Sequence, residues 1–125
     1  MKKLTFLLMA ALFAANSYAD TSYTITGTGS DLTLTITGTG DMPNYTSGNA
    51  PWYSQGANIK TLIIEDEVTS IGNNAFYYCI GLTSVVIPNA VTSIGDNAFY
   101  QCSGLTSVTI GNSVTFIGDN AFYYC

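Results

Sequence analysis

Apolar positions recur with a period of 23 residues from Ile59 to the end of the chain. The repeat units are residues 59–81, 82–104 and 105–125, and the last unit stops two residues short of the period. The second and third units are identical at 16 of 21 positions, and the first and second at 12 of 23. A unit of this length cannot bury its own apolar edge, so the units are expected to stack as coils that share one core.

Each unit contains two short apolar segments and an Ala-Phe pair. The first segment alternates apolar and polar residues, which predicts a strand with alternate side chains pointing inward. The Ala-Phe pair supplies the largest apolar volume of each coil. The predicted inward residues are Ile59, Leu62, Ile64, Val68, Ile71, Ala75 and Phe76, then Leu82, Val85, Ile87, Val91, Ile94, Ala98 and Phe99, then Leu105, Val108, Ile110, Val114, Ile117, Ala121 and Phe122.

A glycine followed by Asn or Asp separates the second segment from the Ala-Phe pair. Gly72, Gly95 and Gly118 stand where the chain is expected to turn without a Cβ atom. An Asn or Asp beside each glycine suits a turn that hydrogen-bonds to its own backbone.

Residues 20–58 are expected to cover the first coil. Residues 23–40 alternate threonine with apolar residues around a Gly-Ser-Asp turn, a pattern that predicts a β-hairpin. In the loop that follows, Tyr53 lies one period before Phe76, so this loop is a candidate degenerate coil. We expect Trp52 to belong to the capping core, with a ligand platform as the alternative. The cap and core aromatic residues are then Trp52, Tyr53, Phe76, Phe99 and Phe122.

Residues 1–19 have the pattern of a secretory signal peptide. Lys2 and Lys3 precede an apolar stretch, and Ser17-Tyr18-Ala19 is a small-x-small cleavage site. The apolar stretch is too short to span ~30 Å of hydrocarbon. We therefore expect export to the cell surface or the medium, with no membrane insertion after cleavage.

The unit L-T-S-V-x-I-P-x-x-V-T-S-I-G-x-x-A-F-x-x-C-x-G resembles the BspA-like leucine-rich repeat of bacterial surface proteins. The segments 42–45 and 50–53 resemble the cap that often precedes such repeats. The resemblance implies a mainly β fold with short irregular or helical turns, namely a leucine-rich-repeat solenoid of about three coils with an N-terminal β-hairpin cap. It also implies a surface protein that binds host or neighbouring-cell proteins and has no catalytic residues. The chain departs from the broader leucine-rich pattern at its Asn/Cys position, where it has Glu67, Ala90 and Ser113.

Composition excludes several classes of function. The 125 residues include no histidine, three cations and eight acids, and the net charge of −5 becomes −7 if the signal is removed. Without histidine, Ser-His and Cys-His catalysis and histidine-bearing zinc sites are excluded. Too few cations remain to hold a nucleic-acid backbone. We expect no enzymatic activity, no cofactor, no metal and no nucleic-acid partner.

One cysteine occurs at the same position of each coil. A disulfide between neighbouring coils and a thiolate metal site are the functional alternatives. Parallel Cβ vectors in a column do not favour a bridge, and there is no Cys-x-x-Cys pair. We expect a column of small buried hydrophobic residues, made of Cys79, Cys102 and Cys125.

Glu65-Asp66-Glu67 is the one charge cluster. A calcium site would need oxygen ligands spread at loop spacing, so three consecutive acids are interpreted as a solvated turn.

The outward positions of the first strands are the candidate binding surface. They form two columns of small uncharged side chains that could accept an extended protein segment, although β-propensity alone would also place them there. Outward tyrosines at 77, 78, 100, 123 and 124 form a second candidate surface. The proposed face consists of Thr61, Ile63, Ser84, Val86, Ser107 and Thr109.

These observations favour a non-catalytic adhesion or binding module for extracellular or host proteins. A structural spacer that presents a C-terminal functional domain is the alternative. A carboxylate hydrolase is the weakest hypothesis, because Asp96 and Asp119 are repeat-equivalent turn residues. The third unit would expose Val108, Ile110 and Ile117, which predicts either a fragment of a longer array or self-association through the open C-terminal coil.

Overall fold

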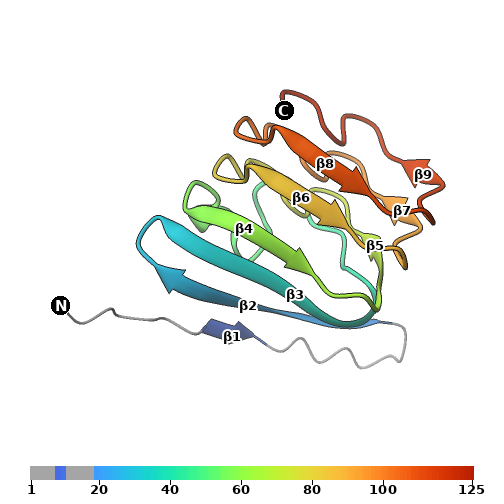
Figure 1. Ribbon diagram of the computed structural model, residues 1–125, viewed down its shortest axis with the longest axis horizontal. Helices are drawn as coiled ribbons and strands as arrows, with labels where there is room; N and C mark the ends of the chain where they lie inside the picture. The colour runs from blue at the N-terminus through green and yellow to red at the C-terminus, as the bar shows by residue number, and fades with distance from the viewer. Residues whose placement is uncertain (1–7, 11–18) are drawn as a thin grey trace.

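The computed structural model describes residues 8–10 and 19–125, which form a stack of coils on an N-terminal hairpin (Figure 1). The predicted signal peptide lies outside the described residues except for Ala19 and the strand β1, Leu8–Ala10. β1 pairs antiparallel with β2, and Leu8 lies opposite Ile25. Among the described residues, no helix is long and apolar enough to span a membrane.

The expected β-hairpin is present. It consists of β2, Ala19–Thr28, and β3, Asp31–Asp41, which pair antiparallel along ten residues. Gly29 adopts a φ of 57° in the two-residue turn between them, a conformation that glycine reaches without a Cβ clash. Alternate residues of both strands point into the core, and the buried apolar ones are Tyr23, Ile25, Leu34 and Ile36.

Each coil contributes two strands. The first strands are β4, Ile59–Ile64, β6, Ser84–Ile87, and β8, Ser107–Ile110; the second strands are β5, Val68–Ile71, β7, Ser93–Ile94, and β9, Phe116–Ile117. The long strand β3 pairs parallel with β4 through its first half and with β5 through its end. The hairpin therefore occupies the place of a preceding coil on both sides.

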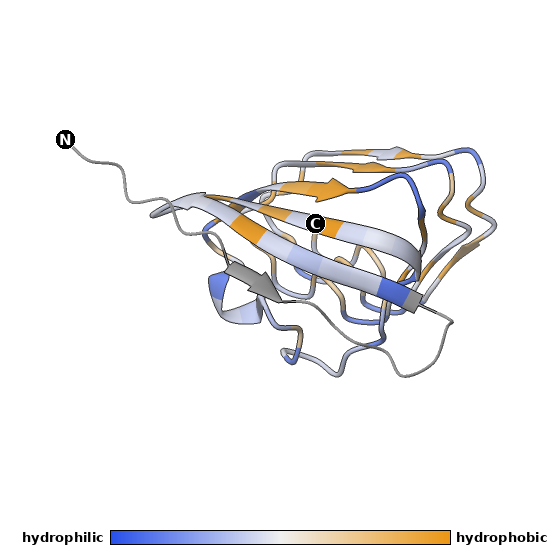
Figure 2. Cartoon of the chain, turned by 90° about the horizontal axis from the view of Figure 1, so that it is seen from below, coloured by the Kyte–Doolittle hydropathy of each residue, from blue (hydrophilic) through white to orange (hydrophobic). Residues whose placement is uncertain are grey.

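The third side of the stack is made of turns that hydrogen-bond from coil to coil. Phe76 N donates to Ala98 O at 2.7 Å, and Phe99 N donates to Ala121 O at 2.7 Å. A short 3-10 helix, η1, Tyr53–Gln55, continues this side into the cap. Figure 2 shows apolar segments along the strands and hydrophilic segments at the turns.

Aromatic rings stack through the centre of the core. The centroids of Trp52 and Phe76 are 5.8 Å apart, those of Phe76 and Phe99 5.1 Å, and those of Phe99 and Phe122 5.2 Å. Trp52 Nε1 donates to Ala75 O at 2.8 Å, which satisfies the one polar atom of a buried indole. Trp52 thus joins the cap to the first coil.

Tyr53 does not belong to this core. Its side chain is exposed, and its ring lies 6.5 Å from Tyr77 on the outer surface. Trp52 takes the position over Phe76, because the indole fills the core and its N–H reaches a carbonyl of the first coil. The residue that packs over Phe76 is therefore Trp52, one position before Tyr53, the residue reached by counting back 23 positions.

The glycines that recur once per coil, Gly72, Gly95 and Gly118, are needed for close packing against the preceding segment. A Cβ on Gly95 would lie 2.6 Å from Asn73 N of the preceding coil. The left-handed positions are elsewhere, at Asn74, Tyr78, Asn97, Gln101, Asn120 and Tyr124, with φ between 54° and 60°. The expectation that these positions exclude a Cβ is therefore confirmed, but the reason is contact with the preceding segment rather than a left-handed turn conformation.

The third coil has no covering layer within the described residues. Ile110 and Ile117 are exposed, as the sequence predicts, and Val108 is half-buried. Phe116 is also exposed, and Phe122 is only half-buried because the aromatic stack ends there. Cys125 is exposed as well, so the predicted buried cysteine column contains only Cys79 and Cys102.

Candidate protein-binding face

The first strands of the three coils lie side by side and present one outward surface (Figure 1). We call this surface the strand face. Ser84 lies opposite Ser107, and Val86 opposite Thr109, in the parallel pairing of β6 with β8. All of its members are exposed: Thr61, Ile63, Ser84, Val86, Ser107 and Thr109.

The strand face continues onto the hairpin. Thr33 pairs with Thr61, and Thr35 pairs with Ile63, so the outward threonines of β3 extend the same columns. Ser22 Oγ and Thr37 Oγ1 are 2.7 Å apart and share a hydrogen bond on this side. Sequence reasoning assigned residues 23–40 only to the cap, although their threonine alternation was the signal for this extension.

The sheet is interrupted between β4 and β6. β4 belongs with β3 to the larger sheet, whereas β6 and β8 form a separate two-stranded sheet. Thr106 N donates to Thr83 O at 2.9 Å at the start of β8, and no corresponding bond joins Thr83 to Lys60 in the described chain. We call this interruption the seam.

Pro88 ends β6 at the seam. In the first coil, Glu65 N donates to Ile36 O at 3.0 Å and closes the end of the β3–β4 ladder. Pro88 stands one period after Glu65 and has no N–H, so it cannot make the equivalent bond to Ile64 O. Gly111, its equivalent after β8, makes no such bond to Ile87 O in the described residues although β8 pairs with β6, so the missing N–H does not by itself interrupt the sheet. The coils remain joined on their other sides, where β5 pairs with β7 and the Ala-Phe turns are bonded.

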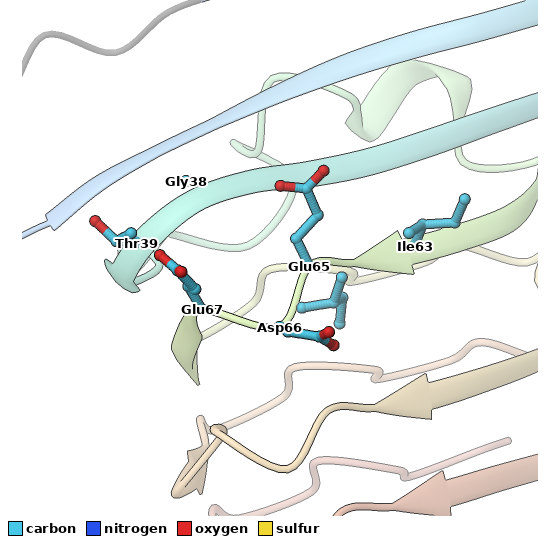
Figure 3. Close-up of a pocket in the computed structure, with 7 residues that line it drawn as sticks. Gly38, Thr39, Ile63, Glu65, Asp66 and Glu67 are labelled. Atoms are coloured by element: carbon cyan, nitrogen blue, oxygen red, sulfur yellow. The ribbon is translucent and has the colours of Figure 1, made fainter.

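Two adjoining hollows open beside the seam. The smaller, about 230 Å³, is lined by β4 and β6 residues, and the larger, about 530 Å³, extends along the acidic turn to the end of β3 (Figure 3). Ile63, Ile64 and Asp66 line both. The smaller hollow is completed by Leu62, Val86 and Pro88, and the larger by Gly38, Thr39, Glu65 and Glu67.

The acidic turn is held in place by its backbone. Glu65 N is bonded to β3, and Glu67 O accepts from Gly40 N at 3.0 Å. Figure 3 shows the Glu65 side chain over β3, Glu67 near Thr39, and Asp66 directed away from both. No group of three or more acids or cysteines in the described residues is placed to hold a metal ion.

Neither hollow is lined by a cation. Lys60 lies at the other end of β4, where its Nζ donates to Ala57 O at 3.2 Å. The larger hollow is therefore a negatively charged region next to exposed apolar side chains.

The three cysteines are free thiols, and two of them donate to a backbone carbonyl of the preceding coil. Cys102 Sγ donates to Phe76 O and Cys125 Sγ to Phe99 O, each at 3.2 Å. Burial raises the pKa of Cys79 to about 12 and also raises the pKa values of Cys102 and Cys125. These thiols stay protonated at neutral pH, so they are poor nucleophiles and poor metal ligands there.

The outward tyrosines form a second continuous surface. The rings of Tyr77 and Tyr100 are 5.1 Å apart and nearly parallel, and Tyr123 follows Tyr100 at 5.5 Å. Tyr78 and Tyr124 lie beside this stack, and both are exposed. The rings face one another, so this surface presents mainly ring edges and hydroxyl groups.

Stacked strand-and-turn coils behind a hairpin cap define a leucine-rich-repeat solenoid. A family model described as a BspA type leucine-rich repeat region (6 copies) matches residues 47–125, and the chain belongs to this family. Leucine-rich-repeat domains generally mediate protein–protein binding and are typically non-catalytic.

A solved structure supports the same fold. The crystal structure of a leucine-rich repeat protein from Eubacterium ventriosum ATCC 27560 is similar, with a TM-score of 0.72 and 35% sequence identity. The similarity covers 91% of this chain and 30% of that one, so this chain spans less than a third of its length. No curated protein matches the chain.

Proposed function

We propose that this chain is an exported, non-catalytic module that binds extracellular or host proteins through the strand face. The observation that carries the proposal is the exposure of Val86 and Ile63, at 63% and 47%, among small hydroxyl side chains on paired strands. Exposed apolar side chains on ordered strands can gain apolar burial on binding without reordering the fold. Export is supported by the signal-peptide pattern of residues 1–19.

A binding panel with matched variants tests this proposal. The purified chain would be measured against a panel of extracellular-matrix and cell-surface proteins by surface plasmon resonance. The variant Ile63→Ser/Val86→Ser should weaken binding roughly tenfold or more, which corresponds to about 1.4 kcal/mol. Ile80→Ser is the control, because Ile80 is similarly exposed at 44% but lies outside the strand face.

Two outcomes contradict the proposal. One is that no protein of the panel binds. The other is that Ile80→Ser weakens binding as much as the strand-face variant, which would place the contact elsewhere.

A further inference from the structure

The strand face is not uniform, because the seam divides it. Along β6 and β8 the outward residues lie on a continuous ladder, whereas β4 and β6 share no ladder and have the two hollows beside them. We propose that the partner docks at this seam as an extended segment that carries an apolar side chain next to lysine or arginine. This inference rests on the proposed function and names the chemistry of the partner.

The smaller hollow provides the apolar contact. Apart from Asp66, its lining is apolar, and two of its residues, Ile63 and Val86, are largely exposed without a partner side chain. At about 230 Å³ it is smaller than the ~300–1,000 Å³ of sites for whole small molecules. A single aliphatic side chain of a protein segment fits this size and would cover both exposed residues.

The partner lies on the outward side of the seam. β4 and β6 share no ladder, yet β6 still lies beside β4, so a strand does not fit between them. An extended segment laid across the outward side directs alternate side chains toward the strand face, at the spacing that extended peptides use in recognition.

Asp66 lies between the apolar smaller hollow and the acidic larger hollow and lines both. It stands one period before Asn89, whose Oδ1 accepts from Asn112 N at 3.1 Å. No equivalent bond joins Asp66 to Asn89 in the described residues, so its carboxylate is free of the coil-to-coil contact and lines both hollows. A segment with an apolar side chain in the smaller hollow can therefore place a neighbouring cation in the larger one.

The negative charge of the larger hollow favours a basic residue in the partner. Glu65, Asp66 and Glu67 are all exposed at the larger hollow, and no cation lines it. Each exposed ion pair contributes modestly in water, but three like charges exclude acidic segments and accelerate encounter with basic ones. Binding should accordingly weaken as salt is raised.

A displayed library of random heptapeptides tests the proposal on the whole chain. After selection on immobilised wild-type protein, enriched peptides should combine Val, Ile or Leu with an adjacent Lys or Arg. The selected peptides should lose at least roughly tenfold in affinity on the variant Glu65→Gln/Asp66→Asn/Glu67→Gln and on Val86→Ser. The matched charge control is Asp20→Asn/Asp31→Asn/Asp119→Asn, which removes three exposed acids outside both hollows and should keep nearly full affinity.

The outcomes separate this inference from the proposed function. Peptides that lack basic residues, or that bind the triple variant of the acidic turn unchanged, overturn the seam proposal. If those peptides instead lose affinity for the variant Ser107→Gln/Thr109→Gln on β8, the strand face still binds protein but at another place. If no peptide is enriched over uncoated surface, and the protein panel is also negative, both proposals fall. Circular dichroism of each variant establishes that the coils remain folded.

Discussion

Left-handed residues close each coil without glycine. Asn74 and Tyr78 have φ values of 55° and 60°, and their counterparts in the next coil are Asn97 and Gln101. For a bulky residue this conformation is costly, ~1–2 kcal/mol. It persists because the turn is fixed from the next coil, where Tyr100 O accepts from Tyr78 N at 2.8 Å. Tyrosine and glutamine give no sign of this conformation in the sequence.

Burial of the Cys79 thiol makes the free energy of unfolding depend on pH in the alkaline range. The pKa of Cys79 rises from 9.0 to about 12, so the folded chain holds this proton more tightly than the unfolded chain. Its contribution to the free energy of unfolding is complete below pH 9 and is lost as the pH rises toward 12.

Cys79→Ala should therefore flatten the decline of stability between pH 9 and 12. The wild type should lose up to ~1.4 kcal/mol per pH unit more than the variant in that window, although the variant is the less stable protein at pH 7. Urea unfolding at a series of pH values measures this difference. Cys125→Ala is the comparison variant, because that thiol is exposed and burial raises its pKa less than that of Cys79, so its removal should flatten the decline less. Parallel pH curves for wild type and Cys79→Ala would contradict the prediction.

Neighbouring coils are joined at one turn by side-chain oxygens. Oδ1 of Asn44 accepts from Asn73 N, Oδ1 of Asn73 from Asp96 N, and Oδ1 of Asp96 from Asp119 N, each at 2.8 Å. The sequence predicted turns that bond their own backbone; the bonds instead run from one coil to the next. Each coil thus satisfies a backbone N–H of its successor.

Asp96→Ala should lower the free energy of unfolding by about 1 kcal/mol, since it leaves Asp119 N without its partner. Asp96→Asn should retain nearly all of the stability, because Asn73 performs the same role one coil earlier. Asp119→Ala is the matched control, since Asp119 Oδ1 accepts no bond from a further coil in the described residues. Equal losses for Asp96→Ala and Asp119→Ala, measured by urea unfolding, would show that the bond contributes nothing.

The sequence predicts the elements better than their junctions. The apolar alternation places β4, β6 and β8, and the Ala-Phe pairs place the aromatic stack, because both follow from which side chains must leave water. The seam escapes this reasoning, since Ile63 and Val86 have the same pattern as residues on a continuous ladder. Trp52 was expected in the capping core and lies there, whereas Tyr53 was also expected there and is exposed. The choice between the two depends on a hydrogen bond from the indole to Ala75 O, which the apolar pattern does not encode.

The whole molecule is a stack with two unlike ends. β3 covers the first coil on both sides, whereas the third coil exposes Ile110, Phe116 and Ile117. A hollow of about 250 Å³ lies at this end, between Leu105 and Phe122. The exposed end presents Ile110 and Ile117, the positions that the preceding coil buries as Ile87 and Ile94.

A copy of residues 103–104 followed by a copy of residues 82–104, fused after Cys125 so that the third unit is completed, should raise the free energy of unfolding by about 3 kcal/mol or more. The added coil would bury Ile110 and Ile117, at ~1.5–3 kcal/mol for each one fully covered. Denaturant unfolding should show a higher midpoint and a larger m-value. The control is the same extension with serine at its Val, Ile, Leu and Phe positions. A midpoint no higher than that of the control would mean that the end does not accept a coil.

The equal coil spacing also has a genetic consequence. The second and third coils are identical at 16 of 21 amino-acid positions, and coding segments that retain such similarity undergo unequal recombination, which adds or deletes whole units in frame. Each such event would preserve the turn bonds, the aromatic stack and the cap, since these depend only on the neighbouring coil. The acidic turn would remain unique, because only the first coil carries Glu65-Asp66-Glu67. Lineages could then change the length of the array while inheriting one docking position.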